Sequence, residues 1–123
     1  HRENIGLLAY SPLGFGVLTG KYMNGVIPKG SRLEVMPNYK RYSSYQCSKA
    51  TKLYNELAKE SGLSLTQLAL SFVNDRSFVT SNIIGATNIL QLKENIGSHK
   101  IKLSKEILSQ INAIHNKIPN PAV

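Results

Sequence analysis

The chain has 123 residues, 41% of them hydrophobic, a formal net charge of +8 and one cysteine, Cys47. It is long enough for one domain with a modest core, and it contains neither a membrane span of ~20 apolar residues, nor an apolar signal segment, nor a disulfide framework, so we expect a reducing, cytoplasmic compartment. The charge favours anionic partners, which could be nucleic acid, a membrane surface or a phosphorylated cofactor.

The first predicted element is a strand over residues 5–10, Ile-Gly-Leu-Leu-Ala-Tyr. Its continuous apolarity is typical of a strand buried on both faces in a parallel sheet. Pro12 cannot donate to a ladder, so the strand should end before it. The chain begins directly at this strand, as expected for a piece cut from a longer protein. On physical grounds alone Tyr10 would be a core aromatic residue at a strand end.

A glycine-rich loop ending in Lys21 follows the strand and invites comparison with phosphate-binding loops. The Walker pattern fails because Phe15 stands at its first glycine and Tyr22 replaces its Ser or Thr. The dinucleotide pattern fails because Thr19 occupies its third glycine position. A glycine-rich loop at a strand end remains, which is a modest signal for phosphate binding.

Residues 23–42 are predicted to form a long loop, since they carry four glycine and proline residues and little periodicity. Loops of this length are usually functional or mobile. Arg32 lies inside it, and a guanidinium can clamp a phosphate with two parallel hydrogen bonds. The alternative is a solvated arginine.

Two helices are predicted next. The first spans about residues 43–61 and should stop at Gly62. Cys47 lies on its apolar face, where packing is the expected role because no base is near in sequence. Ser64 should cap the second helix, with Gln67 completing a capping box before an apolar stripe over residues 65–73.

A second strand over residues 78–84 then leads through a small-residue turn into a helix. The order strand, helices, strand predicts a right-handed parallel crossover. Asn88 is the expected N-cap, and Gln91 could reach back to it as in a capping box. The exposed N–H groups and the positive dipole end of such a helix suit a phosphate, and Gly85 would let a ligand approach the backbone.

The two faces of this helix differ in character. Gln91, Glu94 and Asn95 share a polar face that suits the sugar and base of a nucleotide. A solvated polar face is the common alternative. The opposite face is apolar and is the one expected to be buried; it carries Ile89, Leu92 and Ile96.

The last predicted helix runs over about residues 104–115. Ser104 should be its N-cap, and Leu103 with Leu108 could form a hydrophobic staple. The tail at 119–121 is expected to be loose. The three histidines, His1, His99 and His115, lack the spacing of metal ligands, so we assign no metal site.

Two motifs stand out in combination: Ser-Pro-Leu-x-x-Gly-x-Leu-Thr-Gly-Lys-Tyr over 11–22, and Ile-Ile-Gly-Ala-Thr-Asn with Gln-Leu-x-Glu-Asn over 83–95. They resemble the loop after the seventh strand and the last strand with its helix in the aldo-keto reductase family. The Gln-Leu-x-Glu-Asn helix is similar to the bacterial and potassium-channel β-subunit-like branch. The resemblance implies an α/β fold, the C-terminal portion of a TIM (β/α)₈ barrel of ~250 residues, with two parallel strands and about four helices in one unit over residues 1–123.

The resemblance also implies NADPH as the cofactor. Tyr10 would stack on the nicotinamide, residues 11–16 would lie along the pyrophosphate, and Lys21 and Arg32 would approach phosphates. The turn and helix at 85–95 would hold the adenosine 2′-phosphate end. The implied cofactor-binding residues are Tyr10, Ser11, Pro12, Leu13, Gly16, Lys21, Arg32, Gly85, Thr87, Gln91, Glu94 and Asn95.

The family's catalytic tetrad of Asp, Tyr, Lys and His belongs to earlier strands, so the resemblance assigns no catalytic residue here. We therefore expect the intact protein to reduce a small-molecule carbonyl with NADPH, and the 123-residue chain alone to be inactive. Apolar strands without neighbours predict self-association or pairing with the missing barrel half. No membrane partner is expected.

Two alternatives remain open. The charge could belong to a small basic nucleic-acid-binding module, although the basic residues are spread along the chain with only a loose cluster between Lys40 and Lys52. Alternatively, the chain could be a non-catalytic interaction fragment. NADPH-specific binding would count against the first, and native mass would test the second.

Overall fold

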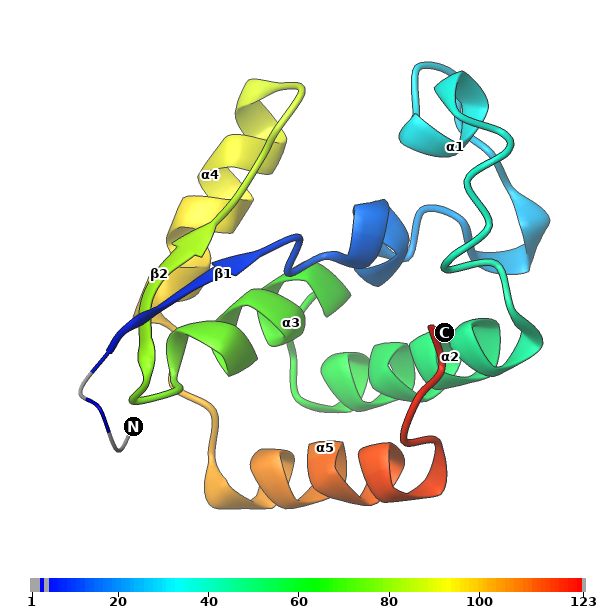
Figure 1. Cartoon of the computed structure of the whole chain (residues 1–123). Coiled ribbons are helices and arrows are strands. Elements are labelled where there is room, and N and C mark those ends of the chain that lie inside the picture. The colour runs from blue at the N-terminus through cyan, green and yellow to red at the C-terminus, as the bar shows by residue number, and fades with distance from the viewer. Residues whose placement is uncertain (1–2, 4, 123) are drawn as a thin grey trace.

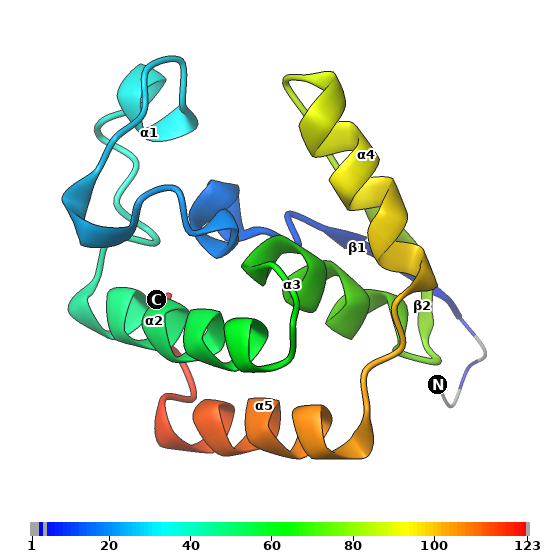
Figure 2. The ribbon, with the colours of Figure 1, turned by 180° about the vertical axis from the view of Figure 1, so that it is seen from behind.

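The computed structural model describes residue 3 and residues 5–122. Its sheet has two parallel strands, β1 (Leu7–Tyr10) and β2 (Val79–Ile83), as the sequence predicts. Figures 1 and 2 show α3 (Leu65–Asn74) between the sheet and α2 (Tyr45–Glu60), while α4 (Ile89–Gly97) rises beside β2. The outermost helix, α5 (Lys105–Lys117), packs against α2.

Four shorter helical pieces complete the described chain: η1 (Gly14–Thr19), η2 (Met23–Gly25), α1 (Arg32–Val35) and η3 (Ser98–Lys100). Three of them lie in the glycine-rich loop and the long segment after it. The predicted long loop over 23–42 contains two short helical turns, η2 and α1, which the lack of periodicity did not indicate. Among all the residues that the structure describes, no helix is long and apolar enough to cross a bilayer.

Gly6, just before β1, packs closely against Thr80 of β2. A Cβ at this position would lie 1.7 Å from the Thr80 Oγ1 atom, so only glycine fits without a shift of the threonine. The register is irregular at the same place, since Leu7 pairs with Val79 but Leu8 pairs with Ser81. Such a register shift inserts an extra residue into one strand and locally disrupts the ladder.

Burial on both strand faces, predicted from apolarity, is not observed. Leu8 is 59% exposed and Ile83 is 50% exposed. The physical reason is that burial of both faces needs a packed layer on each side of the sheet. In the described structure the sheet has two strands, and the helix that packs on it is α3, against β2.

Local signals place the helix ends correctly. The Ser64 hydroxyl oxygen accepts from the Gln67 N–H, and the Gln67 Oε1 atom accepts from the Ser64 N–H, which is the predicted capping box of α3. At the end of α2, Gly62 adopts a left-handed conformation with φ of 68°. The next N–H, from Leu63, then donates to the Ala58 carbonyl at 2.8 Å.

The core lies among α2, α3 and α5, away from the sheet. It is built from the apolar stripes that periodicity predicts for these helices. Leu103, just before α5, belongs to it, and Leu108 packs against it. The buried members are Leu57, Ala58, Leu68, Leu103 and Ile111.

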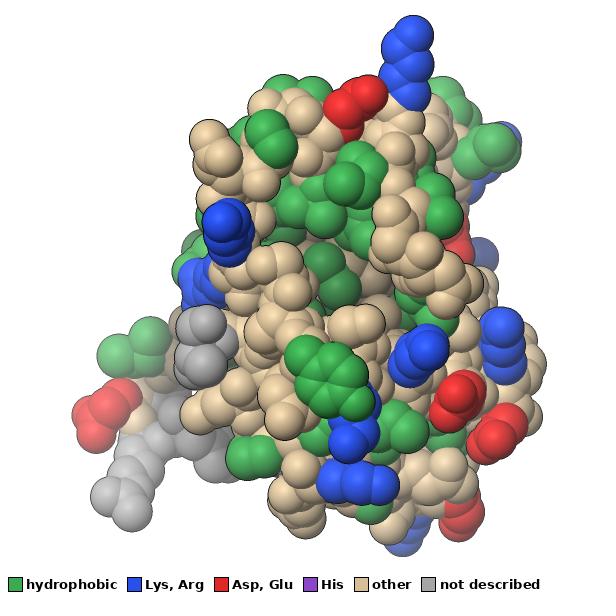
Figure 3. All heavy atoms as spheres, turned by 90° about the vertical axis from the view of Figure 1, so that its right-hand side faces the viewer, with side chains coloured by type: hydrophobic (Ala, Val, Ile, Leu, Met, Phe, Trp, Pro, Cys, Tyr) green, Lys and Arg blue, Asp and Glu red, His purple; other side chains and the backbone are tan. Residues whose placement is uncertain are grey.

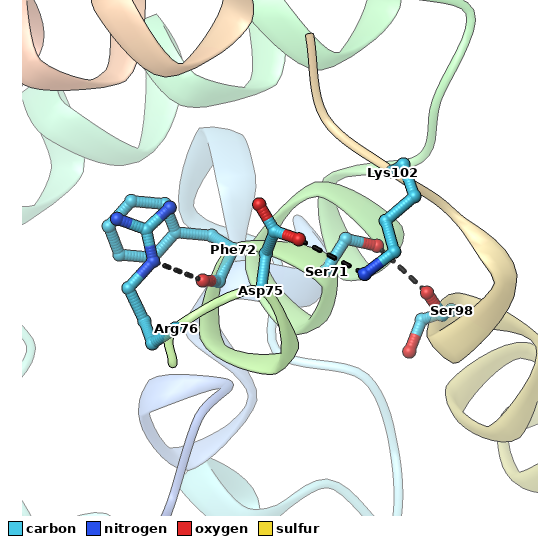
Figure 4. A network of polar contacts seen from close by, with 6 residues as sticks. All are labelled: Ser71, Phe72, Asp75, Arg76, Ser98 and Lys102. Atoms are coloured by element: carbon cyan, nitrogen blue, oxygen red, sulfur yellow. Dashed lines mark hydrogen bonds and ion pairs between the residues drawn. The ribbon is translucent and has the colours of Figure 1, made fainter. Parts of the chain in front are cut away.

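Polar contacts at the end of α3 fix the chain that follows α4 (Figure 4). The fully buried Ser71 hydroxyl donates to the Ser98 carbonyl at 3.0 Å. Asp75, which ends α3, pairs with Lys102 at 3.2 Å, and the Arg76 Nε atom donates to the Phe72 carbonyl at 3.1 Å. The Ser71 and Asp75 contacts tie the segment that follows α4 to the end of α3.

The tail after α5 is anchored, contrary to the prediction that it is loose. Ile118 is buried, and the Pro121 carbonyl accepts a hydrogen bond of 2.6 Å from the Ser44 hydroxyl at the start of α2.

The face in Figure 3 has hydrophobic side chains on its upper part, where the segment with α1 lies. The large exposed hydrophobic residues of that segment are Val26, Ile27, Val35 and Met36.

Candidate functional site

A cleft of about 590 Å³ opens at the carboxyl ends of β1 and β2. Its walls come from the β1–η1 connection, the turn between β2 and α4, the start of α3 and residues 30–32. All twelve residues that the sequence analysis assigns to a cofactor line this one cleft. They are Tyr10, Ser11, Pro12, Leu13, Gly16, Lys21, Arg32, Gly85, Thr87, Gln91, Glu94 and Asn95.

The wall after β1 is a tightly folded backbone. Ser11 and Phe15 have φ of 53° and 61°, a left-handed conformation that is uncommon for residues other than glycine. Gly16, with φ of 92°, leaves room for the lysine side chain, since a Cβ there would lie 2.9 Å from the Lys21 Cε atom. The Thr19 hydroxyl donates to the Gly16 carbonyl at 2.8 Å and closes the loop. The loop therefore presents an ammonium group beside exposed backbone.

The opposite wall begins at the N-terminus of α4. The Asn88 Oδ1 atom accepts from the Gln91 N–H at 2.9 Å, as predicted for the N-cap. The predicted capping box is wrong by one residue, because the Gln91 Oε1 atom accepts from the N–H and the hydroxyl of Thr87, both at 3.0 Å, rather than from Asn88. The side chain thus reaches past the cap and fixes the turn that lines the cleft.

The polar face of α4 points inward, and its apolar face does not. Asn95 is 5% exposed, and its Nδ2 atom donates to the Gly85 carbonyl at 3.2 Å. Glu94 accepts a hydrogen bond from the Ser64 hydroxyl, which joins α4 to the start of α3. The prediction that the apolar face is buried is wrong for this structure, since these polar contacts turn it outward. Its residues remain exposed: Ile89, Leu92 and Ile96.

The charge of the cleft is dominated by cations. Lys21 and Arg32 line it, and Glu94 is the only acidic side chain among the described residues that do. Beside Arg32, the buried Ser31 hydroxyl has no hydrogen-bond partner in the described part of the chain. An unpaired buried hydroxyl is unfavourable unless a ligand or water completes it.

These features fit a phosphorylated dinucleotide. The cleft volume lies within the ~300–1,000 Å³ that is usual for ligand sites. Two cations and an unpaired hydroxyl can bind phosphate oxygens. A Cβ built on Gly85 would meet nothing within 4 Å, so the backbone there faces open space that a ligand can enter.

Sequence reasoning missed several lining residues. Phe15 was predicted only as part of the 11–16 segment and not as a site residue of its own. Ser31 gave no signal because it lies in a segment interpreted as loop. Ser64 was recognised only as a helix cap, yet it also reaches Glu94 across the cleft. The lining residues absent from the twelve individually predicted ones are Phe15, Thr19, Gly30, Ser31, Ser64, Thr66, Ile83, Ile84 and Ala86; of these, Phe15 and Ala86 lie inside the predicted segments 11–16 and 85–95.

The cysteine and the histidines lie outside the cleft wherever they are described. Burial raises the pKa of the Cys47 thiol above its usual value, which keeps it protonated and suits the predicted packing role. His99 and His115 are exposed, and His1 lies outside the described residues. The described residues contain no group of three His, Cys, Asp or Glu side chains that could hold a metal ion.

Comparison with known proteins places this geometry in a family. The model of the "Aldo/keto reductase family" matches residues 1–116. The chain is 46% identical over 120 residues to "Protein tas" of Escherichia coli, covering 98% of this chain and 35% of that protein. It is 37% identical over 121 residues to a "Probable voltage-gated potassium channel subunit beta" of rice, covering 94% of this chain and 37% of that protein. The predicted branch is thereby confirmed.

A solved structure extends the likeness to three dimensions. The glycerol dehydrogenase of Gluconobacter oxydans superposes with a TM-score of 0.72 and 25% identity, covering 98% of this chain and 37% of that one. The predicted fold class, the C-terminal portion of a TIM barrel, is confirmed. The chain spans about a third of the length of the relatives it matches.

Proposed function

This chain belongs to the aldo/keto reductase family of oxidoreductases, and we propose that it forms the NADPH-binding part of an enzyme that reduces aldehydes or ketones by hydride transfer. The family generally uses NADP(H). The observation that carries the proposal is the meeting of Lys21, Arg32 and the α4 start around one cleft. Bound there, the cofactor would supply the hydride, and the residues of this chain would bind and orient it.

Each wall has a distinct part in this proposal. Tyr10, 75% exposed at the end of β1, offers a free aromatic face on which a nicotinamide ring can stack. Lys21 and the loop before it would neutralise the pyrophosphate. Arg32 and Gln91 would bind the adenosine 2′-phosphate, while Glu94 and Asn95 would contact the nucleoside.

The catalytic step would lie outside this chain. The proton donor expected for the family belongs to the tetrad on earlier strands, and no residue of the cleft is assigned that role. We therefore propose that the chain alone leaves NADPH oxidation at background over a panel of aldehydes. Turnover well above background would contradict this assignment and make Tyr10 the first donor to test.

Arg32→Ala tests the proposal most sharply. It should weaken NADPH binding by about 1–3 kcal/mol, the scale of a charge-assisted hydrogen bond. NADH lacks the 2′-phosphate, so its affinity should barely change. Titration calorimetry on the chain with both cofactors measures the difference.

Arg76→Ala is the matched control, because Arg76 lies away from the cleft with its guanidinium 4.4 Å from the Phe72 ring centroid. It should leave both affinities unchanged. Equal losses of NADPH and NADH affinity in Arg32→Ala would remove this arginine from the 2′-phosphate site, and an unmodified chain that binds neither cofactor would reject the proposed function.

A further inference from the structure

An aromatic stack joins the glycine-rich loop to the segment that carries Arg32. The Phe15 and Tyr39 ring centroids are 4.2 Å apart with an angle of 21° between the ring planes. The Arg32 Cζ atom lies 5.3 Å from the centroid of the same Phe15 ring. The Phe15 ring therefore contacts both the Arg32 guanidinium in the cleft and the ring of Tyr39, seven residues after Arg32.

The Arg32 guanidinium has the Phe15 ring as its cation–π partner. Within the described residues the one ion pair is Lys102–Asp75, so Arg32 has no carboxylate beside it there. Arginine loses much rotamer freedom when it binds a ligand. A ring that already holds the guanidinium reduces that loss and leaves its donors free for an anion.

The backbone holds Phe15 in an uncommon conformation. Its φ of 61° is left-handed, between Gly14 and Gly16, which are also left-handed. Such strain at a residue other than glycine persists only where surrounding contacts determine it, and it concentrates at functional sites. The ring contact of Phe15 is with Tyr39, whose own ring lies 6.0 Å from the Tyr42 ring, centroid to centroid.

We propose that Phe15 and Tyr39 are positioning residues that hold the Arg32 guanidinium against the cleft and so set its selectivity for a dinucleotide with the additional 2′-phosphate. The inference rests on the proposed function for the identity of the ligand. The orientation of Arg32 is a property of the free chain and can be measured without it.

The test compares NADPH and NADH affinities of the chain in leucine variants. Phe15→Leu and Tyr39→Leu retain apolar volume and lose the stack. Each should weaken NADPH binding about two- to fivefold, the range of an exposed cation–π or aromatic contact, and leave NADH unchanged. Tyr39→Phe keeps the ring and should retain full selectivity.

Tyr45→Leu is the matched control. Tyr45 is 77% exposed at the start of α2 and lies outside the stack, so its removal should not alter the NADPH-to-NADH ratio. A second measurement needs no cofactor: the rate at which phenylglyoxal modifies Arg32 relative to Arg76, followed by mass spectrometry. Loss of the stack should raise this ratio.

The outcomes separate the two proposals. Failure of the unmodified chain to bind either cofactor would reject the proposed function, while the modification ratio would still test the stack. An unchanged NADPH-to-NADH ratio in both leucine variants, or equal losses of both affinities, would overturn the positioning role. An unchanged modification ratio would overturn it as well, even if a leucine variant is too unstable for titration.

Discussion

At the scale of single residues, the anion preference of the cleft comes from Lys21, Arg32 and the unpaired Ser31 hydroxyl. Lys21 and Arg32 attract anions through their positive charge, whereas Ser31 can only donate a hydrogen bond. Ser31 is 6% exposed and its Oγ atom has no partner in the described part of the chain. Removal of this hydroxyl should therefore lower the affinity for the ligand without lowering the free energy of unfolding.

Ser31→Ala should lower NADPH affinity by about 0.5–1.5 kcal/mol, or up to about 3 kcal/mol if the hydroxyl bonds a charged phosphate. The free energy of unfolding should stay unchanged or rise, because a buried unsatisfied group is removed and no protein hydrogen bond is lost. Calorimetry and urea unfolding on the same samples provide both values.

Ser48→Ala serves as the control, since Ser48 is exposed on α2. It should change neither quantity beyond about 0.5 kcal/mol. A clear loss of stability in Ser31→Ala with unchanged affinity would show that the hydroxyl serves the fold instead of the ligand.

The residue scale also shows what the sequence could predict. Asn88 and Gln91 were recognisable because their positions at the helix start follow from local spacing, whereas Lys21 was assigned through the family resemblance after the Walker spacing had failed. The Gln91 side chain nevertheless bonds Thr87 in place of Asn88, a choice between adjacent N–H groups that spacing cannot make. The Phe15–Tyr39 stack lies beyond prediction because it joins two irregular segments.

At the scale of elements, the ends of α4 could be predicted from the sequence, but the face that it buries could not. Its cap and length follow from Asn88 and the residues after it, so its position in the sequence was predictable. Which face packs inward was not, because burial depends on the partner. The hydrogen bonds from Asn95 to Gly85 and from Ser64 to Glu94 bring the polar face to the cleft, and the apolar face stays exposed.

The strands follow the same logic. Their apolarity predicted a parallel sheet, and the pairing confirms it. It also predicted burial that the described chain does not supply, because a strand of this type expects neighbours at both edges. The helices α2, α3 and α5 met their predictions because they bury one another within the chain.

At the scale of the whole molecule, the sheet and α4 together leave a large apolar area exposed. Apart from Tyr10 in the cleft, its members in the sheet region are Ile5, Leu7, Leu8, Phe78 and Ile83, and those on α4 are Ile89, Leu90, Leu92 and Ile96. Many exposed large apolar side chains together with free strand edges are typical of an interaction surface. We propose that a second copy of the chain, or the remaining barrel strands, covers this surface.

The purified chain should therefore associate, with more than the ~1,000 Å² of buried area that marks a specific contact. Sedimentation velocity over about a hundredfold dilution should show a dimer or larger species that dissociates as concentration falls. A folded monomer at every concentration would reject the association and show that the exposed strands are stable without cover.

The central claim is that one cleft of this chain binds a 2′-phosphorylated nucleotide. Amide chemical shifts of the ¹⁵N-labelled chain, followed during titration with adenosine 2′,5′-bisphosphate, test it most directly. We expect saturable shifts concentrated at residues 11–21, 31–32 and 85–95. Shifts confined to the basic residues between Lys40 and Lys52, with the cleft unchanged and binding lost steeply with salt, would contradict it and favour a nucleic-acid-binding surface.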